Sequence, residues 1–157
     1  MDNLLKRKKK IIVIDDEPLI SILMKDIVEE DHELEIAKIT QAKDDFLDSI
    51  GQNPFDAAFI DISVGGREGG IELLHVMKDK AIDLPCIVLS AHDELHYAPK
   101  CLQAGAKGYI NKKYICTHVV TCIKEVLAGR LFVSGDKGEY ILRQYKNSNT
   151  PVGIVNS

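Results

Sequence analysis

The chain of 157 residues contains no tryptophan, few aromatic residues of any kind (6%) and no long apolar run. A membrane-spanning helix needs roughly 20 consecutive, mostly apolar residues, and no segment approaches that length. A secretory signal peptide needs an apolar segment behind a basic N-terminus, and none follows the basic residues 6–10. We therefore predict a cytoplasmic protein that does not interact with membranes.

The chain also lacks the charge excess and the cysteine spacing that mark two other classes of protein. A formal net charge of −4 gives no general argument for nucleic-acid binding. The four cysteines form no Cys-x-x-Cys pair, and a chain of this size needs no disulfides, so we predict reduced thiols. With 45% hydrophobic and 28% charged residues, the composition is that of an ordinary globular domain.

Strand and helix signals alternate five times along the chain. Apolar runs rich in β-branched residues predict strands at 11–14, 34–38, 55–60, 86–89 and 108–110. Apolar residues at helical spacing predict helices around 20–27, 46–50, 71–77 and 119–127. A short fourth helix should carry Pro99 in its first turn and end at Gly105. Helical crossovers between successive strands imply an α/β fold, a three-layer α/β/α sandwich around a five-stranded parallel sheet.

We place this domain at residues 10–130 and expect less structure on either side of it. Residues 1–9 end in a block of like charges, which repel one another, so we predict a basic N-terminal tail. Residues 131–157 are polar and rich in glycine and asparagine, and we predict a linker or C-terminal tail, with at most one helical turn that docks back through Tyr140, Ile141, Leu142 and Tyr145. A DNA-binding helix-turn-helix does not fit in so short a stretch.

Acidic residues follow two of the predicted strands at their carboxyl ends. Asp15 and Asp16 come directly after the strand at 11–14, and Asp61 comes directly after the strand that ends at Ile60. Parallel strands bring their carboxyl ends to one edge of the sheet, where ligands bind. Carboxylates that crowd together there raise one another's pKa values unless a cation lies between them, and oxygen-only clusters suit Mg²⁺.

The remaining strand ends add a hydroxyl and an ammonium to the same edge. Ser90 ends the fourth predicted strand, and Lys112 follows the fifth. A carboxylate can attack phosphorus to give an aspartyl-phosphate, and phosphoryl transfer needs positioning together with neutralisation of oxygen charge. Each residue taken singly is equally consistent with a helix cap, a turn or a solvated charge. Their coincidence at four strand ends favours the phosphoryl-transfer site.

These segments resemble the receiver domain of two-component response regulators, and the NarL/LuxR-type branch is the most similar. The resemblance is carried by Ile-Val-Ile-Asp-Asp-Glu-Pro at 12–18, Phe-Ile-Asp-Ile at 59–62, Val-Leu-Ser-Ala at 88–91 and Ala-Gly-Ala-Lys-Gly-Tyr-Ile-Asn-Lys at 104–112. It implies a flavodoxin-like (βα)5 fold. It also implies a signalling domain that catalyses only its own phosphorylation and dephosphorylation, and not a metabolic enzyme.

The resemblance assigns a role to each candidate residue. Asp61 is the implied phosphoacceptor. Mg²⁺ is the implied cofactor, bound directly by Asp16, Asp61 and the backbone carbonyl of Ser63, with Asp15 acting through water. The loop after Asp61 departs from the family pattern, because Val64-Gly65-Gly66 replaces the usual Met-Pro-Gly.

Three further residues are implied to respond to phosphorylation. Lys112 contacts the phosphoryl group, Ser90 turns toward it, and Tyr109 then rotates inward. The responding face is implied to comprise the fourth helix, the fifth strand and the fifth helix. The implied partners are a sensor histidine kinase or a histidine phosphotransferase, with a homodimer also considered, and DNA is reached only through a domain that these residues do not contain.

Three questions stay open at the level of sequence. The output is either that of a LuxR-type transcription factor, of which this is the regulatory part, or that of a stand-alone receiver that binds a protein. A Mg²⁺-dependent aspartyl-phosphate phosphatase is a less favoured alternative, because it needs an acid two residues after the nucleophile, where Ser63 stands. Ile22 lies off the apolar stripe of the first helix and is either a scattered surface residue or a docking contact for the kinase.

Overall fold

The computed structural model describes residues 7–149. All strands run parallel in one sheet with the order β2-β1-β3-β4-β5-β6. The strand bounds are β1 Lys9–Ile14, β2 Leu34–Thr40, β3 Ala57–Asp61, β4 Cys86–Ser90, β5 Gly108–Asn111 and β6 Phe132–Val133. The predicted three-layer α/β architecture with a parallel sheet is confirmed, with one strand more than predicted.

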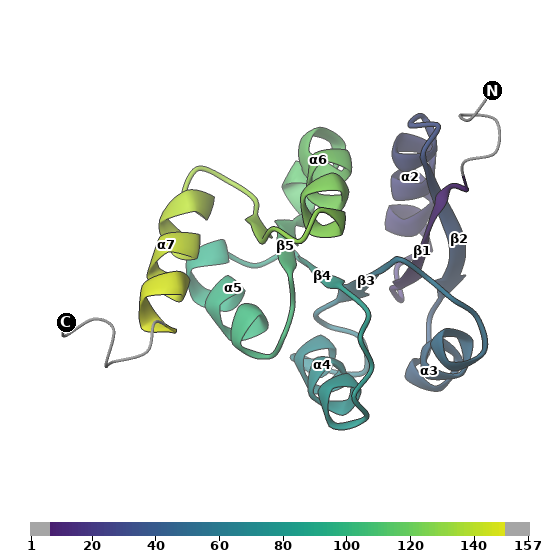
Figure 1. Ribbon diagram of the computed structural model, residues 1–157, viewed down its shortest axis with the longest axis horizontal. Coiled ribbons are helices and arrows are strands. Elements are labelled where there is room, and N and C mark those ends of the chain that lie inside the picture. Colours follow the sequence, from purple (N-terminus) through teal and green to yellow (C-terminus); the bar gives the residue numbers. More distant parts are fainter. Residues whose placement is uncertain (1–6, 150–157) are drawn as a thin grey trace.

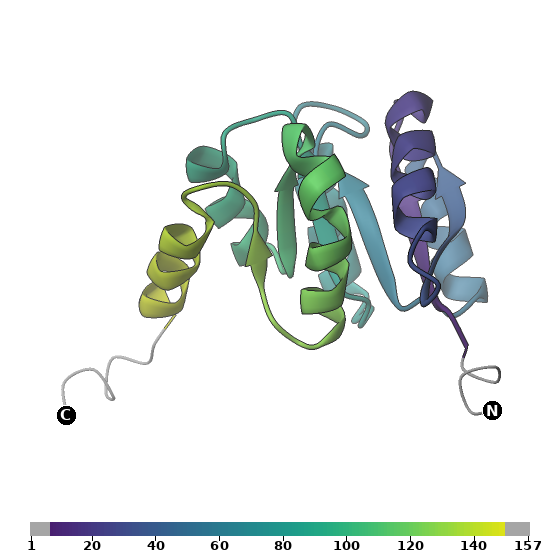
Figure 2. The ribbon, with the colours of Figure 1, turned by 90° about the horizontal axis from the view of Figure 1, so that it is seen from above.

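Helices cover both faces of this sheet (Figures 1 and 2). One face packs against α3, α4, α5 and α7, and the opposite face packs against α2 and α6. The helix bounds are α2 Pro18–Glu29, α3 Lys43–Gln52, α4 Gly69–Asp79, α5 Glu94–Gln103, the 3₁₀ turn η1 Lys112–Tyr114, α6 Ile115–Leu127 and α7 Gly138–Ser148. No helix among residues 7–149 combines the length and the hydrophobicity needed to cross a membrane.

The central strands are apolar on both sides because both sides lie under helices. In β1, Ile11 and Val13 pack toward α2 and α6, whereas Ile12 and Ile14 pack toward the α3, α4 and α5 side. All four side chains are fully buried. This double burial explains why the run reads as continuous apolar sequence and why it ends abruptly at Asp15.

The structure differs from the sequence-based expectation in the helix that follows β4. Pro99 lies in the interior of α5 and not in its first turn, since α5 begins at Glu94. The Asp93 side chain accepts a hydrogen bond from the Leu95 N–H at 3.0 Å, which caps the start of the helix. The predicted end is confirmed, because α5 stops at Gln103 and Gly105 follows with φ +109°.

The segment expected to be a linker or tail contains ordered structure on the sheet. β6 pairs with the outer edge of β5, and α7 packs beside α5 (Figure 1). Two of the three elements of the predicted responding face, α5 and β5, are therefore covered in part by the chain's own C-terminal segment. A packed helix can still lead into a further domain, so the boundary at residue 130 stays a prediction.

Four cysteine thiols are free, as predicted for reduced cysteines. Cys86, Cys101 and Cys122 are buried, and Cys116 is exposed. Burial raises the pKa of the Cys86 thiol to about 12, so this thiol is inert at neutral pH. The buried cysteines therefore act as small core residues.

Candidate functional site

Four acidic side chains converge at the carboxyl edge of the sheet. Asp15, Asp16 and Glu17 follow β1, and Asp61 is the last residue of β3. Because β1 and β3 are neighbours in the sheet, the two chain segments end side by side. One carboxylate oxygen of each residue lies within 4.8 Å of those of the other three. The structure thus brings the predicted acids together.

Asp61 is held in place by donors on both of its oxygens. Its Oδ1 accepts hydrogen bonds from the Ser63 backbone N–H at 2.9 Å and from the Ser63 hydroxyl at 2.8 Å. Its Oδ2 accepts from Lys112 Nζ at 2.9 Å. Burial alone would raise the pKa of Asp61, but these hydrogen bonds outweigh burial and lower the pKa below its ordinary value. Asp61 is therefore a carboxylate at neutral pH.

Lys112 reaches this pocket from the loop after β5, across the end of β4. Its ammonium also contacts Glu17 Oε1 at 2.8 Å, so one cation bridges two acidic residues. Burial lowers the pKa of Lys112, but its hydrogen bonds to Glu17 and Asp61 more than compensate and raise the pKa above the ordinary value. Glu17 was not among the predicted site residues, although its position next to Asp16 is a sequence signal for it.

Within residues 7–149, Asp15 is the one buried acid with a buried oxygen that has no hydrogen-bond partner. Its Oδ1 accepts the Glu17 N–H at 2.8 Å, whereas its Oδ2 is buried without a hydrogen bond. Burial, together with the adjacent Asp61 carboxylate, raises the pKa of Asp15 to about 7. A buried carboxylate oxygen aimed at other carboxylates fits a hard divalent cation, which would supply the missing partner. The donors of this cluster are oxygens only, as Mg²⁺ prefers.

The loop after Asp61 contains glycines in backbone conformations or close contacts that disfavour a side chain. The Ser63 carbonyl, a predicted metal ligand, accepts the Gly66 N–H at 3.2 Å and retains a second lone pair. Gly65 and Gly66 adopt φ +72° and +138°. A Cβ on Gly70 would lie 2.7 Å from the Asp61 carbonyl oxygen. The backbone therefore crosses close beneath the candidate phosphoacceptor.

Ser90 of β4 and Tyr109 of β5 are both hydrogen-bonded to His92, in the loop after β4. The Ser90 hydroxyl accepts the His92 N–H at 2.9 Å, and the Tyr109 hydroxyl donates to the His92 carbonyl at 2.7 Å. Both side chains are fully buried. Tyr109 thus already occupies an inward position in this structure.

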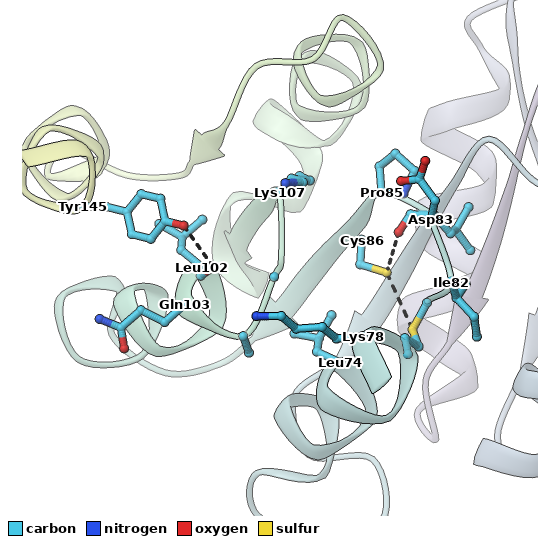
Figure 3. A pocket seen from close by; sticks show the side chains of 14 residues that line it. Leu74, Lys78, Ile82, Asp83, Pro85, Cys86, Leu102, Gln103, Lys107 and Tyr145 are labelled. Atoms are coloured by element: carbon cyan, nitrogen blue, oxygen red, sulfur yellow. Dashed lines mark hydrogen bonds between the residues drawn. The ribbon is translucent and has the colours of Figure 1, made fainter. Parts of the chain in front are cut away.

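A separate cavity of about 390 Å³ lies at the opposite edge of the sheet (Figure 3). Its lining includes Pro85 and Cys86 at the start of β4, Lys78 of α4 and Tyr145 of α7. Because it opens at the amino ends of the strands, it is remote from the carboxyl edge that carries Asp61. The converging acids, and not this cavity, are the candidate site.

Comparison with known proteins agrees with this geometry. The pattern of the response regulator receiver domain family matches residues 11–124. Response regulator UvrY of Escherichia coli K12 is 26% identical over 126 residues, which are 80% of this chain and 57% of UvrY. The chain thus spans little more than half the length of this relative.

Solved structures share the fold. A LuxR-family response regulator from Aurantimonas superposes with a TM-score of 0.76 at 19% identity, covering 90% of this chain and 97% of that one. The non-phosphorylated receiver domain of the Escherichia coli stress response regulator RcsB gives 0.74 at 17% identity, covering 82% and 100%. The predicted resemblance is confirmed: the chain belongs to the response regulator receiver domain family.

Proposed function

We propose that Asp61 accepts a phosphoryl group from a phosphohistidine of a sensor histidine kinase or histidine phosphotransferase in the cytoplasm. The observation that carries the proposal is the Asp61 carboxylate held between Ser63 and Lys112 and beside Asp15 and Asp16. An Asp61 oxygen forms the new O–P bond while the donor's P–N bond breaks, and the released imidazole takes up a proton. The product is an aspartyl-phosphate.

The residues around Asp61 have separate tasks in this transfer. Lys112 Nζ, 2.9 Å from Asp61 Oδ2, neutralises charge on the phosphoryl oxygens. The Ser90 hydroxyl accepts a hydrogen bond from the His92 N–H at 2.9 Å, and we assign it as a hydrogen-bond donor to a phosphoryl oxygen after transfer. Mg²⁺ would be held by Asp15, Asp16, Asp61 and the Ser63 carbonyl, and it would supply further charge neutralisation.

The output is proposed to lie in a larger protein. UvrY extends well beyond the region it shares with this chain, which fits a regulatory part of a LuxR-type transcription factor. DNA contact would then come from a further domain. The site does not favour the phosphatase alternative, because the residue two positions after Asp61 is Ser63, which is bonded to Asp61 itself and offers no acid.

Labelling with acetyl phosphate tests the proposal. The Asp61→Asn variant should show no phosphoryl adduct by intact mass, whereas the wild type should be labelled in Mg²⁺ and not after chelation. Asp79→Asn changes an exposed aspartate at the end of α4 and should label normally. Mg²⁺-dependent labelling of Asp61→Asn at the wild-type rate would refute the assignment.

A further inference from the structure

The C-terminal segment β6–α7 occupies the edge of the sheet beyond β5. Val133 pairs in register with Tyr109, and the Ser134 N–H donates to the Tyr109 carbonyl at 3.0 Å. Ile141 of α7 is 3% exposed and belongs to the same core cluster as Tyr109. The Tyr145 hydroxyl donates to the Leu102 carbonyl of α5 at 3.4 Å (Figure 3). The segment is therefore docked along both β5 and α5.

Ser134 is the polar centre of this docking. It is fully buried, and its hydroxyl accepts the Asn111 backbone N–H at 2.8 Å and contacts Glu94 Oε1 at 3.3 Å. Asn111 ends β5 immediately before Lys112, whose ammonium binds Asp61. Asn111, which is hydrogen-bonded to Ser134, is therefore adjacent in the chain to Lys112, which binds Asp61.

A second set of hydrogen bonds, through the loop after β4, connects the candidate site with the docked C-terminal segment. The His92 carbonyl accepts both the Asn111 side-chain amide at 3.2 Å and the Tyr109 hydroxyl at 2.7 Å. The His92 N–H donates to the Ser90 hydroxyl at 2.9 Å, at the end of β4. The bonds from Ser90 to Ser134 are thus complete before phosphorylation.

We infer that docking of β6–α7 and phosphorylation of Asp61 stabilise each other. A phosphoryl group adds an acceptor for Ser90 and Lys112 at one end of a hydrogen-bonded chain that is already formed, and such chains strengthen cooperatively. Tyr109 already lies inward, with its hydroxyl bonded to the His92 carbonyl, while β6 pairs with its strand. The segment acts as an intramolecular clamp on the site. Because coupling between two sites is reciprocal, undocking of the segment weakens binding of the phosphoryl group by the same factor by which phosphorylation increases the equilibrium constant for docking.

Hydrogen–deuterium exchange of the full 157-residue chain tests this inference, which rests on the proposed function. In Mg²⁺, the phosphoryl mimic beryllofluoride should slow exchange in peptides covering 132–148 by about fivefold or more. Acetyl phosphate labelling of the same sample reports separately on Asp61. Labelling with unchanged or faster exchange in 132–148 would overturn the clamp and leave the proposed function standing. Absence of both labelling and beryllofluoride binding would overturn both.

Matched variants in α7 test the reverse direction. Ile141→Ala removes a buried anchor, whereas Arg143→Ala alters an exposed position of the same helix. Ile141→Ala should weaken beryllofluoride binding about fivefold or more, and Arg143→Ala should leave it unchanged. Ser134→Ala removes only a hydroxyl and gives a second, milder variant should Ile141→Ala fold poorly. Wild-type affinity in folded Ser134→Ala and Ile141→Ala would contradict the coupling.

Discussion

Asp15 carries the least compensated charge at the site. Its Oδ2 is buried without a partner, and the neighbouring Asp61 is ionised because Ser63 and Lys112 stabilise its carboxylate. Burial, together with the adjacent Asp61 carboxylate, keeps a proton on Asp15 in the absence of a divalent cation and raises the pKa of Asp15 to about 7. The protein in chelator is thus expected to respond to pH over the neutral range.

The stability of the metal-free protein should fall as the pH rises from 5 to 8. The pKa of Asp15 is about 7 in the folded chain against an ordinary 3.8, so the folded state binds more protons in between. The stabilising contribution is complete below 3.8 and is lost as the pH rises through 7, with a slope of at most about 1.4 kcal/mol per pH unit. The pKa of Asp61 is lowered, so its titration affects stability only at more acidic pH and does not contribute to the slope between pH 5 and 8.

Urea unfolding in chelator at pH 5, 6, 7 and 8 measures this slope. The Asp15→Asn variant should lack the Asp15 contribution, so the difference between it and the wild type isolates this group from the five histidines. An identical pH dependence in both proteins would contradict the protonated Asp15.

Two glycines that look alike in sequence should respond in opposite ways to alanine. A Cβ on Gly70 would lie 2.7 Å from both the Asp61 carbonyl oxygen and Ile62 Cα, so Gly70→Ala should destabilise by about 2 kcal/mol or more. Gly51 lies in α3 with open space around its Cβ position, so Gly51→Ala should stabilise by roughly 0.5 kcal/mol. Urea midpoints decide, and a harmless Gly70→Ala would show that the loop beneath Asp61 can shift freely.

At the scale of elements, the central strands and their flanking helices were predictable and the last two elements were not. Residues 11–14 and 86–89 are apolar on both faces, which leaves few alternatives to a buried strand. β6 has only two residues, Phe132 and Val133, too few for any periodicity to register. α7 carries one narrow apolar stripe at Ile141, Leu142 and Tyr145, and the polar residues around it read as a loop.

The positions of most site residues could also be predicted from the sequence, whereas some of their contacts could not. Strand ends identified Asp15, Asp61, Ser90 and Lys112 because a parallel sheet collects them at one edge. The sequence could not show that Glu17 pairs with Lys112, since that contact depends on how a long side chain crosses the pocket. Nor could it show that Tyr109 already points inward, because that depends on a hydrogen bond to the His92 carbonyl that only the folded chain forms.

The helices of the central core and the C-terminal helix α7 should differ in how much they contribute to the free energy of unfolding. Leu73 of α4 is 1% exposed in the central core, so Leu73→Ala should cost about 2–5 kcal/mol. Ile141 is as well buried, but α7 contacts chiefly α5 and β6 and can detach locally, which limits the loss for Ile141→Ala to a smaller value. Urea unfolding of both variants compares them, and equal losses would place α7 within the cooperative core.

At the scale of the molecule, one apolar surface adjoins the candidate site. Leu19, Ile22 and Leu23 share a face of α2 and are 78%, 54% and 41% exposed. α2 begins at Pro18, directly after the acidic residues, so this face lies beside the phosphoacceptor pocket. Exposed apolar patches of this kind mark protein contacts, and under the proposed function the phosphohistidine donor would approach from this side.

Replacing this face should therefore separate partner recognition from chemistry. Leu19→Ala together with Ile22→Ala should slow phosphotransfer from a phosphorylated histidine kinase about tenfold or more, because interface energy concentrates in buried apolar anchors. Labelling by acetyl phosphate should stay normal. Val76→Ala, an exposed apolar position on α4, is the control and should change neither rate. A wild-type rate of phosphotransfer from the kinase to the double variant would show that Ile22 is an exposed hydrophobic residue with no role in docking.

The position of Tyr140 has a practical consequence for following this molecule in solution. Tyr140 of α7 is 52% exposed and borders a groove with Leu95 of α5. Because the chain has no tryptophan, Tyr140→Trp would introduce a single indole at that junction. Its fluorescence would report in real time whether the last helix stays on the domain while the phosphorylation state changes some distance away.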